Sequence, residues 1–216
     1  MTKKKDVSTL RRDYSGRSLT KKDVAENPVE QFARWFRQAL AADLTDANAM
    51  TLATATKQGV PSARIVLLKG FDESGFKFYT NYNSRKGREL EQNPSASLCF
   101  YWPELDRQVR IEGKARKLST EKSASYFQQR PRLSQASAWA SFQSSEIESR
   151  ETLEKKFKEI KKRFKDQEIP LPDFWGGYLL QPSRIEFWQG RPNRLHDRIV
   201  YSKINNTDWE IKRLAP

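Results

Sequence analysis

The sequence predicts a mainly β protein with helices, built as an antiparallel barrel that is closed or partly closed. Short strand-like segments separated by turn residues run from 50 to 119 and again from 175 to 214. These segments do not alternate with crossover helices, which argues against a doubly wound parallel sheet. Aromatic residues make up 12% of the 216 residues, which is enough for a hydrophobic core.

Helices are predicted from capping signals and from the spacing of apolar residues. Asn27, Pro28 and Glu30 supply an N-cap, a proline at the first helical position and a glutamate three residues after the cap. Apolar residues at helical spacing follow, so a helix is expected near 28–43. Further helices are expected at 120–130 and 149–165.

Strands are predicted from the turn residues that separate them. The segment 57–59 ends in glycine and separates the strand-like residues 50–56 from 61–69, and the segment 72–75 separates 61–69 from 76–81. Both are hairpin signals. The remaining strands are expected at 95–102, 107–118, 175–180, 183–189, 194–203 and 208–214.

The first 26 residues are polar with little periodicity, so we predict a mobile N-terminal arm at 1–26 and a single domain at 27–216. The longest aliphatic run, 65–68, is too short to cross a membrane, and no apolar stretch follows the basic N-terminus. The single cysteine, Cys99, excludes an internal disulfide and a multi-cysteine metal site. A cytoplasmic protein without a metal is the expectation.

The formal net charge of +13 raises the question of a nucleic-acid partner. Residues 1–27 carry a net charge of +4 and residues 150–165 carry +5, so most of the excess lies in the arm and on one helix. A small anionic ligand accounts for this distribution as well as a polyanion does. Common phosphate-loop, dinucleotide, zinc-protease and nucleophile-elbow motifs are absent, so an enzyme with this sequence would rely on a bound cofactor.

The first cluster with chemical potential is the segment from Arg64 to Lys69, in which two cations bracket four aliphatic residues. In a regular strand, residues five apart lie on opposite faces. The two cations therefore serve different anions, or a bulge intervenes. On pattern alone, a core strand with charged ends is the favoured interpretation.

The second cluster follows Tyr79 and Thr80. A short helix should begin near Ser84 and end before residue 93, and its free backbone N–H groups together with Arg85 and Lys86 would form a phosphate cradle. Gly87, in the same turn, would let a ligand approach closely. An ordinary capped helix with exposed cations explains the pattern equally well.

The third cluster spans 188–198. If 194–198 is extended, Arg194, His196 and Arg198 share one strand face, where three potential cations repel each other unless an anion lies among them. This crowding favours a functional interpretation.

Together the three clusters resemble the pyridoxine (pyridoxamine) 5'-phosphate oxidase family, and the match covers nearly the whole chain. The resemblance implies an FMN-binding, antiparallel split β-barrel with helices packed around it. It also implies a homodimer with FMN at the subunit interface. The implied activity is oxidation of pyridoxine 5'-phosphate and pyridoxamine 5'-phosphate to pyridoxal 5'-phosphate, by hydride transfer to FMN and reoxidation by O2 with release of H2O2.

The resemblance also assigns residues to ligands. FMN would be bound by Arg64, Ile65, Val66, Leu67, Leu68, Lys69, Tyr79, Thr80, Arg85, Lys86, Gln108, Gln143, Ser144, Trp188 and Arg198. Substrate would be bound by Lys69, Tyr126, Arg130 and Ser134, by Arg194, Leu195 and His196, and by a lid formed from Arg11, Arg12, Asp13 and Tyr14. Arg194 and His196 would be the catalytic pair, chiefly by positioning the pyridine ring.

Two other functions compete with this one. A split-barrel flavoprotein of different activity would keep the FMN residues but should lack Tyr126, Arg130, Ser134, Arg194 and His196 as a set, and all five are present. A nucleic-acid-binding module is suggested by the high pI, but the sequence shows no recognised nucleic-acid motif. Neither a nucleic acid nor a membrane is an expected partner.

Overall fold

The computed structural model describes residues 6–10, 12–14, 17–205 and 207–216. The chain divides into two compact units, which are described separately. Unit 1 comprises Met1–Ala47, Cys99–Ile111 and Arg184–Pro216, and unit 2 comprises Asn48–Leu98 and Glu112–Ser183. The predicted arm at 1–26 and single domain at 27–216 stay predictions, and Arg11 lies outside the described residues.

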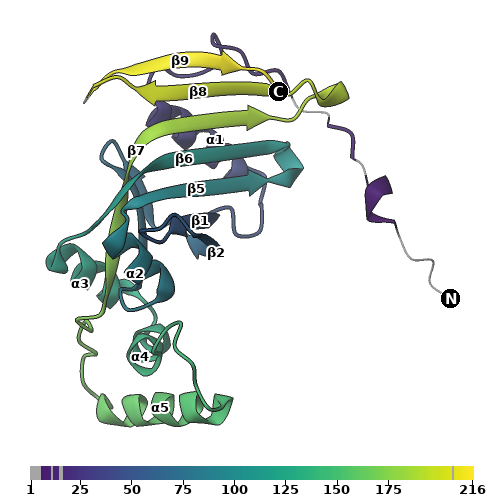
Figure 1. Ribbon diagram of the computed structural model, residues 1–216. Helices are drawn as coiled ribbons and strands as arrows, with labels where there is room; N and C mark the ends of the chain where they lie inside the picture. The colour runs from purple at the N-terminus through teal and green to yellow at the C-terminus, as the bar shows by residue number, and fades with distance from the viewer. Residues whose placement is uncertain (1–5, 11, 15–16, 206) are drawn as a thin grey trace. The chain divides into compact units, whose positions relative to one another are not determined.

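The chain forms an antiparallel sheet (Figure 1). Strands β1 to β4 belong to unit 2, and β5, β6 and β7 each contribute residues to both units. The strands of the sheet path follow the order β2-β1-β5-β6-β7-β4-β3, so β2 and β3 lie at its ends. A tight hairpin joins β1 to β2, and β4 pairs with both β3 and β7. The strand bounds are β1 (Ala49–Ala55), β2 (Pro61–Leu67), β3 (Gly70–Asp72), β4 (Gly75–Asn81), β5 (Ser95–Trp102), β6 (Arg107–Lys117) and β7 (Trp175–Gln189).

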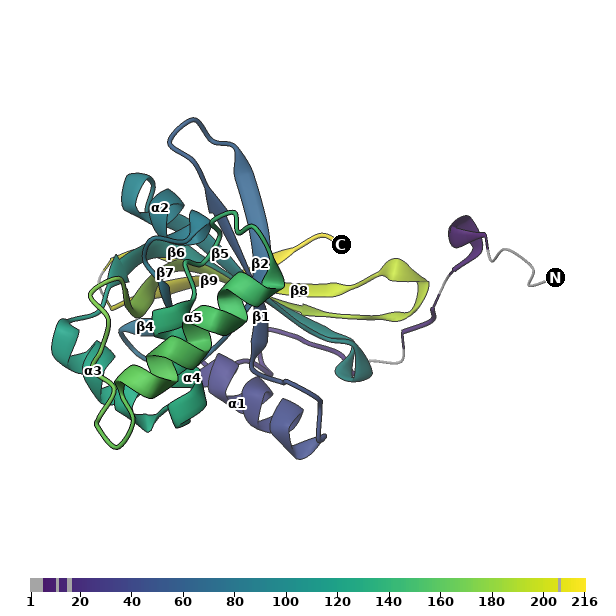
Figure 2. The same cartoon turned by 90° about the horizontal axis from the view of Figure 1, so that it is seen from below.

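The helices of unit 2 are α2 (Arg85–Gln92), α3 (Thr120–Gln129), α4 (Arg132–Ala140) and α5 (Arg150–Arg163). Helix α4 packs against α5, as both views of the molecule show (Figures 1 and 2). A buried cluster that includes Phe127, Phe164 and Trp175 links α3, the end of α5 and β7. The side-chain amide of Gln135 on α4 donates to the carbonyl oxygens of Phe127 and Arg130, at 3.1 and 3.0 Å. Helix α4 therefore fixes the end of α3.

Unit 1 contains α1 (Pro28–Ala41), β8 (Asp197–Lys203) and β9 (Trp209–Leu214). The N-cap of α1 forms as expected, because the Asn27 side chain accepts hydrogen bonds from two backbone N–H groups of the first turn. Strand β8 pairs with β9 and with the second half of β7. The core of unit 1 holds fully buried rings, and the Tyr201 hydroxyl donates to the Ala25 carbonyl oxygen at 2.6 Å. Short 3-10 turns occur at Val7–Thr9, Pro103–Leu105 and Pro192–Arg194.

The predicted fold class, mainly β and antiparallel with packed helices, is confirmed. The two strands predicted at 175–180 and 183–189 are one strand, β7. Its first part pairs with β4 and its second part with β8, and Pro182, which has no N–H to donate, lies between the two paired segments. In the described part of the chain, no helix is both long and apolar enough to span a bilayer.

The strand predicted to begin at residue 194 begins only at Asp197. Asn193 and Arg194 have φ values of 56° and 60°, in the left-handed region, and form a 3-10 turn. The prediction that Arg194, His196 and Arg198 share one strand face is therefore wrong, because strand periodicity does not extend through a left-handed turn.

The packing of α2 on the preceding turn gives a test of the fold. A Cβ atom built on Gly87 would lie 2.0 Å from the Tyr82 carbonyl oxygen, so the space beside Gly87 is taken by backbone and not by a ligand. Helix propensity alone favours alanine over glycine by about 1 kcal/mol. We expect the clash to outweigh this preference. Gly87→Ala should therefore lower the free energy of unfolding, measured in urea titrations, by about 1–3 kcal/mol.

Gly70→Ala is the matched control, because its added Cβ would meet nothing closer than 3.6 Å. We expect that variant to unfold within about 0.5 kcal/mol of the parent. Equal or greater stability of Gly87→Ala would contradict the described approach of α2 to Tyr82.

Candidate functional site

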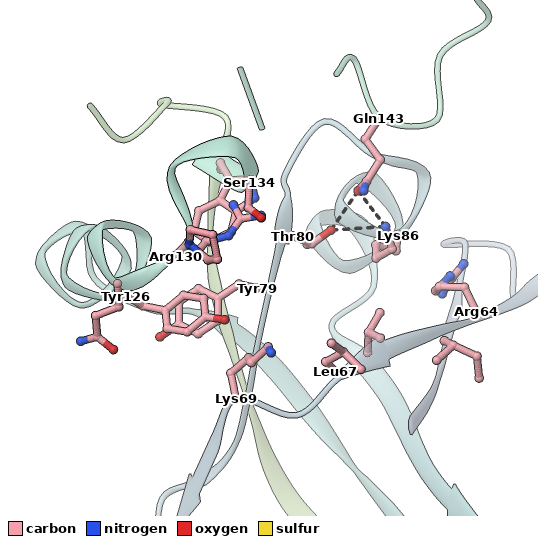
Figure 3. A pocket seen from close by; sticks show the side chains of 15 residues that line it. Arg64, Leu67, Lys69, Tyr79, Thr80, Lys86, Tyr126, Arg130, Ser134 and Gln143 are labelled. Carbon is pink, nitrogen blue, oxygen red and sulfur yellow. Dashed lines mark hydrogen bonds between the residues drawn. The ribbon is translucent and has the colours of Figure 1, made fainter. Parts of the chain in front are cut away.

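Unit 2 encloses a cavity of about 590 Å³ between β2, β4, the start of α2, and the segment that joins α3 to α4 (Figure 3). Most of the residues that line it are ones predicted from the sequence as ligand contacts. These are Arg64, Ile65, Val66, Leu67, Lys69, Tyr79, Thr80, Lys86, Tyr126, Arg130, Ser134 and Gln143. Segments far apart in the sequence therefore meet at one cavity.

Lys86 is the most buried cation of the cavity, with 8% of its surface exposed. Its ammonium group donates to Gln143 Oε1 at 2.9 Å and to Thr80 Oγ1 at 3.3 Å, and the Thr80 hydroxyl donates to the same Gln143 oxygen at 3.0 Å (Figure 3). Burial lowers the pKa of Lys86 to about 8, and the nearby positive charge of Arg64 acts in the same direction. The fold therefore holds an ammonium group that an anion would stabilise.

The helix start predicted from the sequence is present. Ser84 is the N-cap of α2, and its hydroxyl accepts a hydrogen bond from the backbone N–H of Gly87 at 3.3 Å. Arg85 and Lys86 occupy the first turn, where a positive side chain opposes the helix dipole unless an anion is nearby. Arg85 itself is 58% exposed in its side chain and pairs with Glu89 at 2.9 Å.

An aromatic wall forms the opposite side of the cavity. The rings of Tyr79 and Tyr126 stack with centroids 3.8 Å apart and planes at 19°, and the Trp175 ring lies 5.6 Å from Tyr79 and nearly parallel to it. Burial raises the pKa of both tyrosines above the ordinary value, so both hydroxyls stay protonated at neutral pH. Gly177 pairs with Tyr79 across the strands, and a Cβ there would lie 2.8 Å from the tyrosine ring.

Arg130 follows the last residue of α3, and its guanidinium lies over the Trp175 ring, 4.6 Å from the centroid. Burial lowers the pKa of Arg130, and its Nη1 atom is buried without a hydrogen-bond partner among the described residues. An unpaired buried donor costs free energy, which a ligand acceptor would recover. The cavity lining thus includes Arg64, Lys69, Lys86 and Arg130, and no carboxylate among the described residues that form it.

The cations of the first cluster both reach the cavity. Strand β2 ends at Leu67, two residues before Lys69, so strand parity does not separate Lys69 from Arg64. Val66 lines the cavity with them, whereas Leu68 is a buried core residue with 4% exposure. Ser144, next to Gln143, has a φ of 68° and lines a separate, smaller pocket.

The other predicted residues lie in unit 1. Tyr14 packs edge-on against Trp188 and His196, with ring centroids 5.6 and 5.1 Å away. His196 Nδ1 accepts a hydrogen bond from the Arg191 backbone N–H at 3.1 Å, and burial together with the Arg194 charge lowers the pKa of the histidine. A neutral imidazole with its proton on Nε2 fits both observations.

Arg198 is the second residue of β8 and donates two hydrogen bonds to the buried Glu186 carboxylate, at 2.8 and 3.1 Å. In the arm, Arg12 pairs with Asp106. The three remaining predicted residues are Asp13 in the arm, Gln108 on β6 and Leu195, which is 69% exposed.

Three lining residues escaped the sequence analysis, namely Gln129, Pro131 and Trp175. Trp175 is followed by Gly176 and Gly177, and an aromatic residue before two glycines in a strand signals a close approach of another group. That signal was available in the sequence. Gln129 and Pro131 flank Arg130 and show no independent pattern.

The chain matches two family models. Residues 36–164 match the family described as pyridoxamine 5'-phosphate oxidase, and residues 175–216 match the one described as pyridoxine 5'-phosphate oxidase C-terminal dimerisation region. A pyridoxine/pyridoxamine 5'-phosphate oxidase of Crocosphaera subtropica is 55% identical over 213 residues, which cover 98% of this chain and 100% of the relative. One from Rubrobacter xylanophilus is 54% identical over 213 residues, covering 99% and 98%.

Two solved structures resemble this one. PhzG from Burkholderia lata, in complex with tetrahydrophenazine-1-carboxylic acid, has a TM-score of 0.87 and 33% identity, and the match covers 94% of this chain and 100% of PhzG. A pyridoxamine 5'-phosphate oxidase-related, FMN binding protein from Nostoc punctiforme has a TM-score of 0.69 and 20% identity, covering 86% and 97%. The second likeness concerns the fold alone, and it confirms the expected split-barrel fold.

The burial of Lys86 gives a pH prediction. Because burial favours the neutral amine, we expect Lys86 to titrate near pH 8 in the cofactor-free protein, against 10.5 for an ordinary lysine. A bound anion favours the charged form, so saturating sulfate should raise this pKa. Carbon-13 NMR of lysine labelled at Cε measures both values, and Lys86→Arg identifies the resonance. A Lys86 pKa near 10.5 in the absence of an anion would contradict the burial of its ammonium group.

Proposed function

The chain belongs to the pyridoxine/pyridoxamine 5'-phosphate oxidase family, and we propose on that basis that it oxidises pyridoxine 5'-phosphate and pyridoxamine 5'-phosphate to pyridoxal 5'-phosphate with FMN as its cofactor. The observation that carries the proposal is the cavity of unit 2. Four cations line it, Arg130 presents an unpartnered buried donor, and one wall is a stack of aromatic rings. Such a site suits flat ring systems that carry phosphate groups.

The residues present fit FMN. Lys86, Thr80 and Gln143 form a polar triangle at the start of α2, where backbone N–H groups and a buried ammonium favour a phosphate. We assign this end of the cavity, with Arg64 and Arg85, to the flavin phosphate. The exposed side chains of β2, with Ile65 at 65% and Leu67 at 40% exposure, supply apolar surface for the flavin or for a second subunit.

The substrate phosphate is assigned to the other end of the cavity. Lys69, Tyr126, Arg130 and Ser134 line this end. Arg130 offers a guanidinium fork with one donor still unpaired, which matches the planar, bidentate geometry of phosphate recognition. A dianionic phosphate would therefore recover the free energy that burial of Arg130 costs, and the exposed Lys69 would add a second positive charge.

The chemistry divides between cofactor and chain. FMN, when bound, supplies the acceptor for a hydride from the C4' carbon of the substrate and passes the electrons to O2, which gives H2O2. The chain's own residues would bind the two phosphates and orient the rings. Arg194 and His196 are proposed to position the pyridine ring, and Arg12, Asp13 and Tyr14 to form part of a lid.

A homodimer is part of the proposal. Residues 175–216 match a family region described by its role in dimerisation. The proposed FMN ligands include Gln108, Trp188 and Arg198 of unit 1 as well as the cavity residues of unit 2. We propose that two subunits together complete each FMN site.

One other activity has a specific observation in its favour. PhzG, with 33% identity over 94% of this chain, was solved with a tricyclic carboxylic acid. A carboxylate carries one negative charge, whereas a phosphate carries up to two. The proposed vitamin phosphates therefore account better for the four cations that line the cavity of this chain.

The test of the function is an aerobic assay of the purified yellow protein with each of the two phosphorylated substrates. We expect stoichiometric formation of H2O2 and pyridoxal 5'-phosphate, and FMN as the released chromophore. Oxidation of tetrahydrophenazine-1-carboxylic acid without turnover of either vitamin phosphate would contradict the proposal. A colourless protein that does not take up FMN would also contradict it.

The assignment of Arg194 and His196 gives a second test. Because both are proposed to position the ring, we expect Arg194→Met to retain FMN but to lose substrate affinity and reduction rate together. His196→Asn keeps a polar group of similar size and should slow reduction by about tenfold or less. Anaerobic stopped-flow reduction of the bound flavin by pyridoxine 5'-phosphate measures both. A loss of about a thousandfold for His196→Asn at saturating substrate would instead indicate proton transfer by the histidine.

A further inference from the structure

Glu89 is a buried carboxylate that no part of the proposed site uses. It lies on α2 with 5% exposure and does not line the cavity. Its Oε2 atom accepts hydrogen bonds from the Thr54 hydroxyl at 2.5 Å and the Ser62 hydroxyl at 2.6 Å, and its Oε1 atom accepts one from Arg85 Nε at 2.9 Å. Strands β1 and β2 and helix α2 therefore meet at this carboxylate.

Arg64 is attached to the same group of atoms. Its Nη1 atom donates to Thr54 Oγ1 at 2.6 Å and to the Leu52 carbonyl oxygen at 3.1 Å, and its Nη2 atom donates to Ser62 Oγ. Nη2 also lies 3.4 Å from Glu89 Oε2. The Arg64 guanidinium, which lines the cavity, is thus fixed by contacts with the Thr54 and Ser62 hydroxyls and the Glu89 carboxylate, none of which lines the cavity.

The direction of every hydrogen bond in this network follows from Glu89. An ionised carboxylate only accepts, so the hydroxyls of Thr54 and Ser62 must donate to it. Their lone pairs then face Arg64, which only donates. Burial acts to raise the pKa of Glu89, but hydrogen bonds from Ser62, Thr54 and Arg85 and the charge of Arg64 lower it to about 2, so the carboxylate is ionised at neutral pH.

The carboxylate also offsets repulsion between cations. The charge of Arg85 disfavours the charged form of Arg64, and the charge of Arg64 in turn disfavours the charged form of Lys86. Glu89 pairs with both arginines, at 3.4 and 2.9 Å. It therefore allows the arginines to be in place before an anion arrives.

We propose that Glu89 is a positioning residue for the flavin phosphate, because it holds Arg85 directly and Arg64 mainly through the Thr54 and Ser62 hydroxyls, and it does not line the cavity itself. This inference rests on the proposed binding of FMN. A glutamine at 89 keeps one carbonyl acceptor but replaces the other oxygen with an N–H donor, which would face either the Arg85 guanidinium or the two hydroxyls that hold Arg64. It also removes the negative charge that pairs with both arginines.

The direction in which the FMN dissociation constant changes when Glu89 is replaced distinguishes a positioning role from a purely electrostatic one. If Glu89 acted only as a negative charge near an anion site, its removal would tighten FMN binding, because repulsion would fall. If Glu89 positions Arg64, its removal weakens FMN binding although the site gains a positive charge. The two roles predict opposite changes in the same dissociation constant.

The experiment titrates cofactor-free protein with FMN and follows quenching of flavin fluorescence. We expect Glu89→Gln to raise the dissociation constant by about tenfold, the loss typical of one charge-assisted hydrogen bond. Glu91→Gln is the matched control, since Glu91 lies on the same helix but is exposed and pairs with Lys117 at 2.6 Å. This variant should bind FMN within about twofold of the parent.

A double-mutant cycle tests whether Glu89 acts through Arg64. In an Arg64→Met background, Glu89→Gln should raise the dissociation constant by no more than about threefold, because of the two arginines that Glu89 holds only the exposed Arg85 remains. A full tenfold effect in that background would overturn the inference. Unchanged or tighter binding by Glu89→Gln alone would also overturn it.

Ser62→Ala provides a second route if Glu89→Gln does not fold, as judged by thermal unfolding. This substitution removes one hydrogen-bond donor to Glu89 and one acceptor for Arg64. We expect it to weaken FMN binding several-fold, and unchanged binding would count against the inference.

A parent protein that binds no FMN would overturn the proposed function and this inference with it. A parent that binds FMN while the Glu89 and Ser62 variants bind equally well would overturn this inference alone.

Discussion

Repulsion among the positive charges around the cavity of unit 2 is the constraint on which the arrangement of the site depends. Arg64, Lys69, Lys86 and Arg130 line one cavity, and no carboxylate shares the lining in the described residues. Burial of cations is unfavourable unless they are paired or hydrogen-bonded. Burial is also the largest cause of the lowered pKa values of Lys86 and Arg130. A bound phosphate group would offset the free-energy cost of burying Lys86 and Arg130, because it supplies negative charge beside them.

The surrounding elements limit the cost in the absence of a ligand. Gln143 and Thr80 accept hydrogen bonds from Lys86, and Glu89 reaches Arg64 from the side away from the cavity. The Trp175 ring lies under Arg130, where the face of an aromatic ring attracts a cation. These contacts organise the cations without placing a carboxylate in the described cavity lining, and Nη1 of Arg130 still has no hydrogen-bond partner among the described residues.

The sequence predicted the parts of this arrangement that depend on local interactions. The Ser84 cap and the start of α2 follow from residues adjacent in the chain, and so does the Asn27 cap of α1. These patterns survive in the fold because capping and helical spacing are short-range. The antiparallel sheet was predicted for the same reason, since its hairpins carry their own turn residues.

The sequence did not predict features that depend on contacts between distant residues or on an unusual backbone conformation. Helix α4 has no side-chain N-cap, and its place is fixed by Gln135 bonds to the end of α3, which no local pattern shows. The left-handed φ values of Asn193 and Arg194 ended the strand that alternation alone extended to residue 194. The role of Glu89 depends on hydroxyls from two other strands and was invisible in the sequence of α2.

The central claim is that the cation cluster is an anion site that recognises the phosphate of a flavin. Isothermal titration of the cofactor-free protein with FMN and with riboflavin tests it directly, because the two flavins differ only in the phosphate. Charge-assisted hydrogen bonds are worth about 1.5–3 kcal/mol each, so loss of the phosphate should weaken binding by about a hundredfold or more. Comparable affinities for the two flavins would contradict the account.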